Sequence, residues 1–204
     1  MKKILVLLFV SLLAYNPLFA SKVGDRTVGI GLGMLRANFT YSSQKEGVTT
    51  YSISDSENFV SEEVRVAKYF KYGRVGLAAG IGNKKSFTLN GADVSAKNKY
   101  IGIAYDYVFY NFKKFTPYIG AVLSYIKTTF EVYGYTADAD GACYGIEAGM
   151  TYDINDRWEL DFGARYLTSD AKWSNETEFF GTNFKDEVDI NNVKQLYLEI
   201  NYKF

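Results

Sequence analysis

The chain has 204 residues, the size of one domain, and its 23 lysines and arginines balance its 23 aspartates and glutamates. A net charge of zero argues against a nucleic-acid-binding protein, because a basic patch usually shows in the total. The absence of histidine excludes Ser-His-Asp hydrolysis, histidine-ligated zinc and histidine-held haem. The single cysteine excludes a disulfide framework or a multi-cysteine metal site, and we expect no metal and no cofactor.

The composition favours a β-rich protein. Aromatic residues make up 17% of the chain, and there are 18 glycines but only 2 prolines. Aromatic residues favour strands and proline interrupts them, so this combination indicates many strands with tight turns.

Residues 1–20 have the pattern of a secretory signal peptide. A short basic segment at Lys2 and Lys3 precedes an apolar run over residues 4–13, and Ala20 supplies the small residue at a cleavage site. The apolar run is too short to span a bilayer of about 30 Å. We therefore expect an exported domain over residues 21–204, located in the periplasm, outside the cell or in an outer membrane.

The exported part alternates between apolar and polar or small residues with a period of two. At its start, Val28, Ile30, Leu32 and Met34 alternate with glycines, and the phase shifts near Leu35, which predicts a β-bulge there. Seven further segments follow, at about residues 60–72, 75–82, 101–109, 119–125, 144–152, 158–166 and 196–204. Eight segments of about 9–11 residues each predict eight strands able to cross a bilayer at a tilt.

The predicted connections alternate in length. Short connections are expected around Gly73, 111–115 and 155–156, and long polar loops at 42–59, 83–98, 131–141 and 169–189. Short turns on one side and long loops on the other are typical of an outer-membrane barrel. The predicted fold is all-β: an eight-stranded antiparallel transmembrane β-barrel with short periplasmic turns and long extracellular loops.

The polar face of the strands distinguishes a membrane barrel from a soluble, lipocalin-like barrel. Many residues on this face are glycine or have small side chains, and others carry charges of both signs. This is expected for a narrow lumen filled by its own side chains. The charges predict a structural network of ion pairs inside the barrel, formed by Glu63, Arg65, Asp106, Glu147, Glu159, Asp161, Arg165 and Glu199.

Aromatic residues gather near the strand ends, as in the two interfacial belts of a membrane barrel. The short-turn belt is predicted to contain Phe70, Tyr72, Phe109, Phe115, Tyr118, Tyr152, Trp158, Tyr202 and Phe204. The long-loop belt is predicted to contain Tyr41, Phe59, Tyr125, Phe130, Tyr144 and Tyr166.

Several motifs resemble those of small outer-membrane proteins. The segment Thr116-Pro117-Tyr118-Ile119-Gly120-Ala121 is similar to the opening of their fifth strand. Gly145 to Gly149 with Tyr152, and then Trp158 with Ala164-Arg165-Tyr166, are similar to their sixth and seventh strands. The last residues resemble the signal read by the barrel assembly machinery, for which the candidates are Leu198, Ile200, Tyr202 and Phe204. Val122 departs from the pattern, which often has a further glycine there.

The resemblance is to the eight-stranded barrels of the OmpA transmembrane-domain, OmpX and opacity-protein kind, often labelled the porin family. It implies a bacterial outer membrane as the location, with lipid, lipopolysaccharide and the assembly machinery as partners. Adhesion, complement evasion and membrane integrity are the roles that it implies. We expect no nucleic-acid partner, and we expect a monomer.

Two functions remain open for such a barrel. One is a structural and surface-interaction role with a closed lumen, in which loops contact a host or surface ligand through Tyr51, Tyr133, Tyr135, Trp173, Phe179 and Phe180. The alternative is a small porin-like channel for ions or small solutes. An enzyme acting on lipid is disfavoured because the barrel enzymes of this location rely on histidine, and a soluble periplasmic barrel is disfavoured by the polar lumen and terminal Phe204.

Overall fold

The computed structural model describes residues 24–89, 92–109, 114–179 and 181–204, and the expected signal peptide lies outside them. The described chain is all β-sheet, and no helix in it is long and apolar enough to cross a membrane. Its strands are β1 (Arg26–Lys45), β2 (Val48–Phe70), β3 (Gly73–Gly82), β4 (Lys85–Leu89), β5 (Ala92–Val108), β6 (Phe115–Val132), β7 (Tyr135–Asp153), β8 (Trp158–Phe179) and β9 (Thr182–Lys203).

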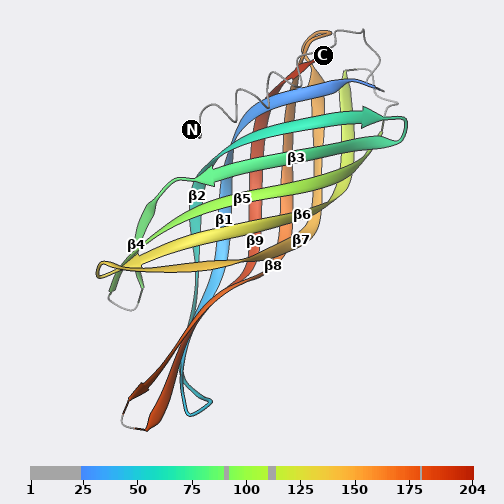
Figure 1. Ribbon diagram of the computed structural model, residues 1–204. Helices are drawn as coiled ribbons and strands as arrows, with labels where there is room; N and C mark the ends of the chain where they lie inside the picture. Colours follow the sequence, from blue (N-terminus) through green and yellow to red (C-terminus); the bar gives the residue numbers. More distant parts are fainter. Residues whose placement is uncertain (1–23, 90–91, 110–113, 180) are drawn as a thin grey trace, which may run out of the picture.

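Eight of these strands close into an antiparallel ring, which confirms the predicted barrel (Figure 1). The ring closes where β3 pairs with β5, while β4 continues along β5 beyond the end of β3. A path of paired residues that leaves β2 at Asn58 returns to β2 at Lys68, ten residues away. One circuit of the ring thus shifts by ten residues of about 3.3 Å along the strands and crosses eight strand spacings of about 4.8 Å. The ratio of these two lengths gives a strand tilt of about 40°.

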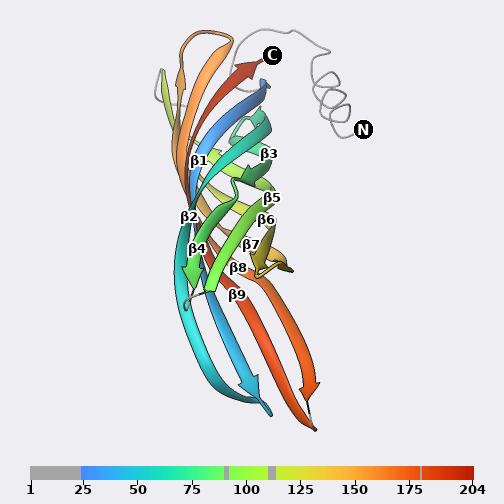
Figure 2. The ribbon, with the colours of Figure 1, turned by 90° about the vertical axis from the view of Figure 1, so that its left-hand side faces the viewer.

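The two ends of the barrel differ strongly. The start of β1, the end of β9 and the short connections from β2 to β3 and from β7 to β8 lie at one end, and long β-hairpins extend from the other (Figures 1 and 2). The polar segments expected to be long loops are mostly strand: β1 and β2 turn at Glu46-Gly47, and β6 and β7 turn at Tyr133-Gly134. Their backbone groups stay paired with the neighbouring strand instead of requiring water, which explains the regular structure.

Beyond the membrane-crossing part, the sheet divides into two lobes. β2 pairs with β3 only as far as Ser61 and Gly82, and β7 pairs with β8 only as far as Asp140 and Lys172. The long lobe consists of residues 37–60 of β1 and β2 and 168–193 of β8 and β9. The short lobe consists of residues 85–89, 92–99 and 126–142, from β4 to β7. Figure 2 shows the long lobe extending beyond the short one.

The polarity of the two barrel faces inverts at the base of the lobes. In β1, Ile30, Leu32 and Met34 point outward, whereas Leu35 and the next alternate apolar residues point inward and are buried. The register remains regular at Leu35 and first shifts between Asn38 and Phe39, so the bulge predicted near Leu35 is wrong. The apolar residues change face because lipid surrounds the lower barrel and water surrounds the lobes.

The interior therefore has two layers. The lower layer is polar, with a small apolar contact of Tyr69, Val108 and Tyr118. The upper layer is an apolar cluster that joins the inner faces of both lobes; its largest members are Leu35, Phe59, Ile126, Phe130, Leu167 and Ile190. The ring of Phe39 from β1 lies 5.5 Å from Phe87 of β4 and 6.1 Å from Phe130 of β6 between centroids. These aromatic contacts connect the lobes across the barrel axis.

The aromatic belts are only partly as predicted. The rings of Trp158, Tyr202 and Phe204 lie together at the short-turn end. Tyr118, however, is 3% exposed and points into the barrel. Phe59 and Phe130 are buried in the apolar upper layer and do not belong to the outer belt.

Candidate functional site

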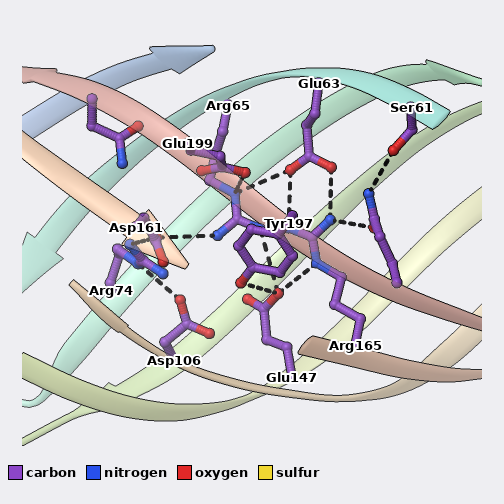
Figure 3. Close-up of polar contacts among 12 residues, drawn as sticks. Ser61, Glu63, Arg65, Arg74, Asp106, Glu147, Asp161, Arg165, Tyr197 and Glu199 are labelled. Carbon is purple, nitrogen blue, oxygen red and sulfur yellow. Dashed lines mark hydrogen bonds and ion pairs between the residues drawn. The ribbon is translucent and has the colours of Figure 1, made fainter. Parts of the chain in front are cut away.

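The eight predicted lumenal residues are all buried inside the barrel. Glu63 and Arg65 lie on β2, Asp106 on β5, Glu147 on β7, and the others on β8 and β9. Seven of them meet in one ionic cluster, together with Arg74 of β3 (Figure 3). We call these eight residues the ionic cluster: Glu63, Arg65, Arg74, Asp106, Glu147, Asp161, Arg165 and Glu199.

Arg165 occupies the upper part of the ionic cluster. Its Nε donates to Glu147 at 2.6 Å, and its two terminal nitrogens donate to the two oxygens of Glu63 at 2.7 and 2.9 Å. One of these nitrogens also donates to Gln195 at 2.9 Å. This paired, two-point contact is the arrangement in which a guanidinium group binds a carboxylate most strongly.

Arg65 lies between several carboxylates at longer distances. Its nitrogens are 3.4 Å from Glu63, 3.4 Å from Glu147 and 3.5 Å from Glu199. The guanidinium group therefore acts mainly as a shared positive charge among these acids. Its carbon also lies 5.1 Å from the centroid of the Tyr197 ring, which is within the range of a cation–π contact.

Arg74 is a central residue that the sequence analysis missed. It is 1% exposed, and it donates to Asp106 at 2.8 Å and to Asp161 at 2.5 Å. It follows Gly73, which was interpreted as a turn, although Gly73 already belongs to β3. The alternation of the strand could have identified it, because Arg74 lies two and four residues before Gly76 and Ala78 and therefore shares the inner face with them.

Tyrosines connect the charged groups. The hydroxyl of Tyr118 donates to Asp161 at 2.6 Å, and the hydroxyls of Tyr118 and Tyr197 are 2.6 Å apart. The guanidinium groups of Arg74 and Arg165 lie over the rings of Tyr118 and Tyr197, at 4.5 and 4.2 Å from the centroids. Each ring thus contacts a cation with its face while its hydroxyl is bonded within the cluster.

Glu159 lies beside Tyr69 and Asn201. Its carboxylate accepts a hydrogen bond from the Tyr69 hydroxyl at 2.9 Å and one from Asn201 at 3.4 Å. Arg74 donates to the same Tyr69 hydroxyl at 3.4 Å, so Tyr69 connects Glu159 to the ionic cluster.

The glycines of β1 provide the space that these side chains occupy. A Cβ atom on Gly31 would lie 2.4 Å from Cγ of Glu199, and one on Gly29 would lie 1.7 Å from Oδ1 of Asn201. A side chain at either position would collide with the lumen contents. β1 therefore forms the smooth wall against which the side chains of β9 pack.

The formal charges in the ionic cluster do not balance, because five carboxylates face three guanidinium groups. Several polar atoms also have no hydrogen-bond partner within the described chain, including both oxygens of Glu199 and Nη1 of Arg65. In the described residues, no group of three or more acids and cysteines is arranged to hold a metal ion. The site can hold protons, water or small cations between its fixed charges.

The residues of the predicted assembly signal lie on the outside of the barrel. Leu198 and Ile200 face outward at 56% and 40% exposure, and Tyr202 and Phe204 continue the same face at the short-turn end. Among the contact candidates, Tyr51, Tyr133 and Tyr135 are exposed. Trp173 is half-buried and packs against the apolar upper layer. Phe180 and the side chain of Phe179 lie outside the described residues.

A ring of eight tilted strands with an apolar outer band and a charged interior defines the class of small membrane-spanning β-barrels. Residues 4–204 match the family model of the outer membrane protein beta-barrel domain. The chain belongs to this family, and its location is the bacterial outer membrane.

Solved structures with this fold have little sequence in common with the chain. The outer membrane protein OprG from Pseudomonas aeruginosa superposes with a TM-score of 0.67 at 16% identity, covering 91% of this chain and 98% of OprG. Neisserial surface protein A superposes with a TM-score of 0.55 at 16% identity, covering 85% of this chain and 97% of that protein. The attachment invasion locus protein Ail of Yersinia pestis superposes with a TM-score of 0.53 at 14% identity, covering 89% of this chain and 99% of Ail. No curated protein sequence matches the chain.

Proposed function

We propose that the protein is a closed outer-membrane anchor that presents its two lobes for contact with a host or environmental surface. The observation that carries this proposal is the tip of the β6–β7 hairpin. Tyr133 and Tyr135 are 76% and 82% exposed there, which makes them available for contact. Exposed tyrosines are common anchors of protein interfaces.

The backbone at this tip is unfavourable for its sequence. Tyr133 has a φ of 47° and Gly134 a φ of 82°, the left-handed pair of a two-residue hairpin turn. Asparagine and glycine suit this turn, whereas a bulky residue in the left-handed region is strained. A strained and exposed tyrosine at a hairpin tip indicates a role in contact that offsets its local cost.

The strand lengths support the same proposal. A tilted strand crosses a bilayer with about 9–11 residues, whereas β2 has 23 residues and β8 and β9 have 22 each. About half of each of these strands therefore extends into the external medium. Lobes built as a regular sheet present a fixed surface and lose less conformational entropy on binding than disordered loops.

The variant Tyr133→Asn with Tyr135→Thr tests the proposal. Asparagine suits the turn, so we expect the barrel to be as stable as the wild type or more stable by about 0.5 kcal/mol. Each form is displayed at equal surface density on bacteria without other adhesins, and the attachment of these bacteria to cultured epithelial cells is counted. We expect several-fold weaker attachment of the variant, and a smaller loss for Val48→Ser, which changes an exposed residue at the tip of the long lobe. Equal attachment of all three forms would refute the proposal.

The alternative is a small channel for ions, favoured by the excess of carboxylates and the unpartnered polar atoms in the lumen. Single-channel conductance of the mature chain in lipid bilayers separates the two. Silence from a folded barrel supports the closed anchor, and steady, cation-selective steps would make the channel the leading function. We propose no enzymatic activity, since the chain lacks histidine and its one cysteine is buried.

A further inference from the structure

Three pairs of cations face each other across neighbouring strands on the outside of the barrel. Arg26 of β1 lies opposite Lys68 of β2 at the short-turn end. Arg36 of β1 lies directly opposite Lys194 of β9, and Lys99 of β5 lies directly opposite Lys127 of β6. Directly opposed side chains have Cβ atoms only about 5 Å apart, so like charges there destabilise the sheet. A negative charge close to such a pair offsets this repulsion.

The pair on β5 and β6 has a negative partner within the protein. Nζ of Lys127 lies 2.6 Å from a carboxylate oxygen of Asp138. Hydrogen bonds from Lys127 and Thr129 lower the pKa of Asp138, so this carboxylate is charged at neutral pH. The negative charge of Asp138 thus offsets the repulsion between the two lysines.

The pair of Arg36 and Lys194 has no carboxylate partner among the described residues. Arg36 donates to the hydroxyl of Ser56 at 2.6 Å, and the Lys194 ammonium group lies 5.6 Å from the centroid of the Tyr166 ring. The outward-facing Glu62 of β2 lies four residues along the strand from Asn58, the partner of Arg36, or about 13 Å away. Both cations are exposed, so their missing partner can come from outside the protein.

The height of this pair on the barrel identifies the partner. Eight residues separate Lys194 from Tyr202 in the short-turn belt, or about 20 Å along the axis at a tilt of about 40°. An outer-membrane barrel has an apolar band about 25 Å tall, so Arg36 and Lys194 lie at its external border. Met34 and Leu196 lie directly below the pair and are 61% and 62% exposed.

The surface directly above the pair carries amide and hydroxyl groups. Asn38 and Asn192 form an amide pair at 3.0 Å, and Asn58 and Ser56 lie beside them on β2. The outer surface therefore has three levels: apolar side chains, two cations, and amide and hydroxyl groups. A glycolipid with acyl chains, a phosphate and sugar hydroxyls has the complementary three levels.

We propose that Arg36 and Lys194 bind a phosphate of the lipid A headgroup of lipopolysaccharide in the external leaflet. The acyl chains lie along Met34 and Leu196, and the sugar lies against the asparagines above. This lipid supplies the anion that offsets the repulsion between the two cations. The site is distinct from the lobe tips and does not depend on the proposed contact function.

The test uses the mature chain refolded in zwitterionic detergent, with native mass spectrometry to measure lipid binding. The probes are bisphosphorylated lipid A, the same lipid A without its phosphates, and phosphatidylglycerol. The double variant Arg36→Gln with Lys194→Gln is compared with Lys127→Gln, a cation at a similar height that has a partner. We expect the double variant to bind bisphosphorylated lipid A at least about tenfold more weakly and the control to bind it as the wild type does.

A stability measurement gives a second, opposite readout. In detergent alone, removing both cations removes their repulsion, so the double variant should unfold at or above the wild-type temperature. With bisphosphorylated lipid A, the wild type should gain several degrees and the double variant little. Unfolding of the double variant at a lower temperature in detergent alone would overturn the repulsion argument.

Three binding results would overturn the proposal. Equal binding of bisphosphorylated lipid A by the wild type and the double variant would exclude the site. Equal binding of dephosphorylated lipid A would exclude the phosphate contact. Binding of phosphatidylglycerol as tight as that of lipid A, through the same two residues, would assign the site to phospholipid instead.

Discussion

Replacing Arg165 by methionine should be one of the most damaging single changes to the barrel. Methionine replaces the unbranched stem of the arginine but removes two hydrogen bonds to Glu63, one to Glu147 and one to Gln195. The Arg165 side chain is 5% exposed and those of Glu63 and Glu147 are 1% and 0% exposed, so water cannot replace these contacts. Breaking a buried ion pair from one side typically costs about 3–5 kcal/mol, and we expect a loss of this size.

The free energy of unfolding can be measured by urea titration in detergent or lipid vesicles, using the heat-modifiable gel band to follow folding. The matched control is Lys127→Met, which removes an exposed ion pair of 2.6 Å and should cost about 1 kcal/mol or less. Arg165→Lys retains the charge but not the two-point contact, and it should give an intermediate loss that remains measurable if the methionine variant fails to fold.

A double variant identifies the cause of the loss. Adding Glu63→Gln to Arg165→Met removes one of the buried carboxylates that the first change leaves uncompensated, and part of the stability should return. If Arg165→Met lies within about 1 kcal/mol of the wild type, or if the second change only adds to the damage, the ionic cluster does not stabilise the barrel as argued.

Three further predictions follow from the packing. Gly31→Ala should destabilise the barrel by about 1–3 kcal/mol, since its Cβ would lie 2.8 Å from the Leu198 carbonyl oxygen, whereas Gly76→Ala, with its nearest atom at 3.6 Å, should be tolerated in the same urea titration. Cys143 is 1% exposed, so maleimide should label it only after unfolding, and fast labelling of the folded barrel would contradict its placement. Phe204→Ala should reduce insertion into the outer membrane of cells, measured by fractionation, more than Phe115→Ala does; equal yields would argue against Phe204 as an assembly signal.

The barrel and most of its charged interior could be predicted because alternation with a period of two fixes which residues share a face. The same rule failed at Leu35, where an unbroken strand was interpreted as bulged. The rule assumes one environment along a strand, but β1 passes from lipid to water. Above Met34 the inner face becomes apolar at Leu35 and the outer face becomes polar at Arg36, without a register shift. A change of phase in a long barrel strand can therefore mark the membrane border.

The interior tyrosines were the harder part of the site to predict. Tyr118 stands near a strand end, where an aromatic residue is also expected in an interfacial belt, and composition alone cannot separate the two positions. Its place follows from parity, because Ile119 points outward at 51% exposure while Tyr118 is buried over Arg74. The hydroxyl contact between Tyr118 and Tyr197 joins β6 to β9, which are not neighbours in the ring, and no local pattern encodes that contact.

The two interior layers together explain why a closed lumen is the better interpretation. An ion on the barrel axis must first displace guanidinium groups from carboxylates at 2.5–2.9 Å, and the charges it separates are buried. It then meets the apolar upper layer, where Leu35, Ile126 and Leu167 offer no polar group to replace its hydration shell. The space between the layers is a cavity of about 30 Å³, lined by Arg165 on one side and Ile126 on the other, and it has room for only one or two water molecules. A barrel built to conduct would need neither layer, whereas a rigid support for external lobes gains stability from both.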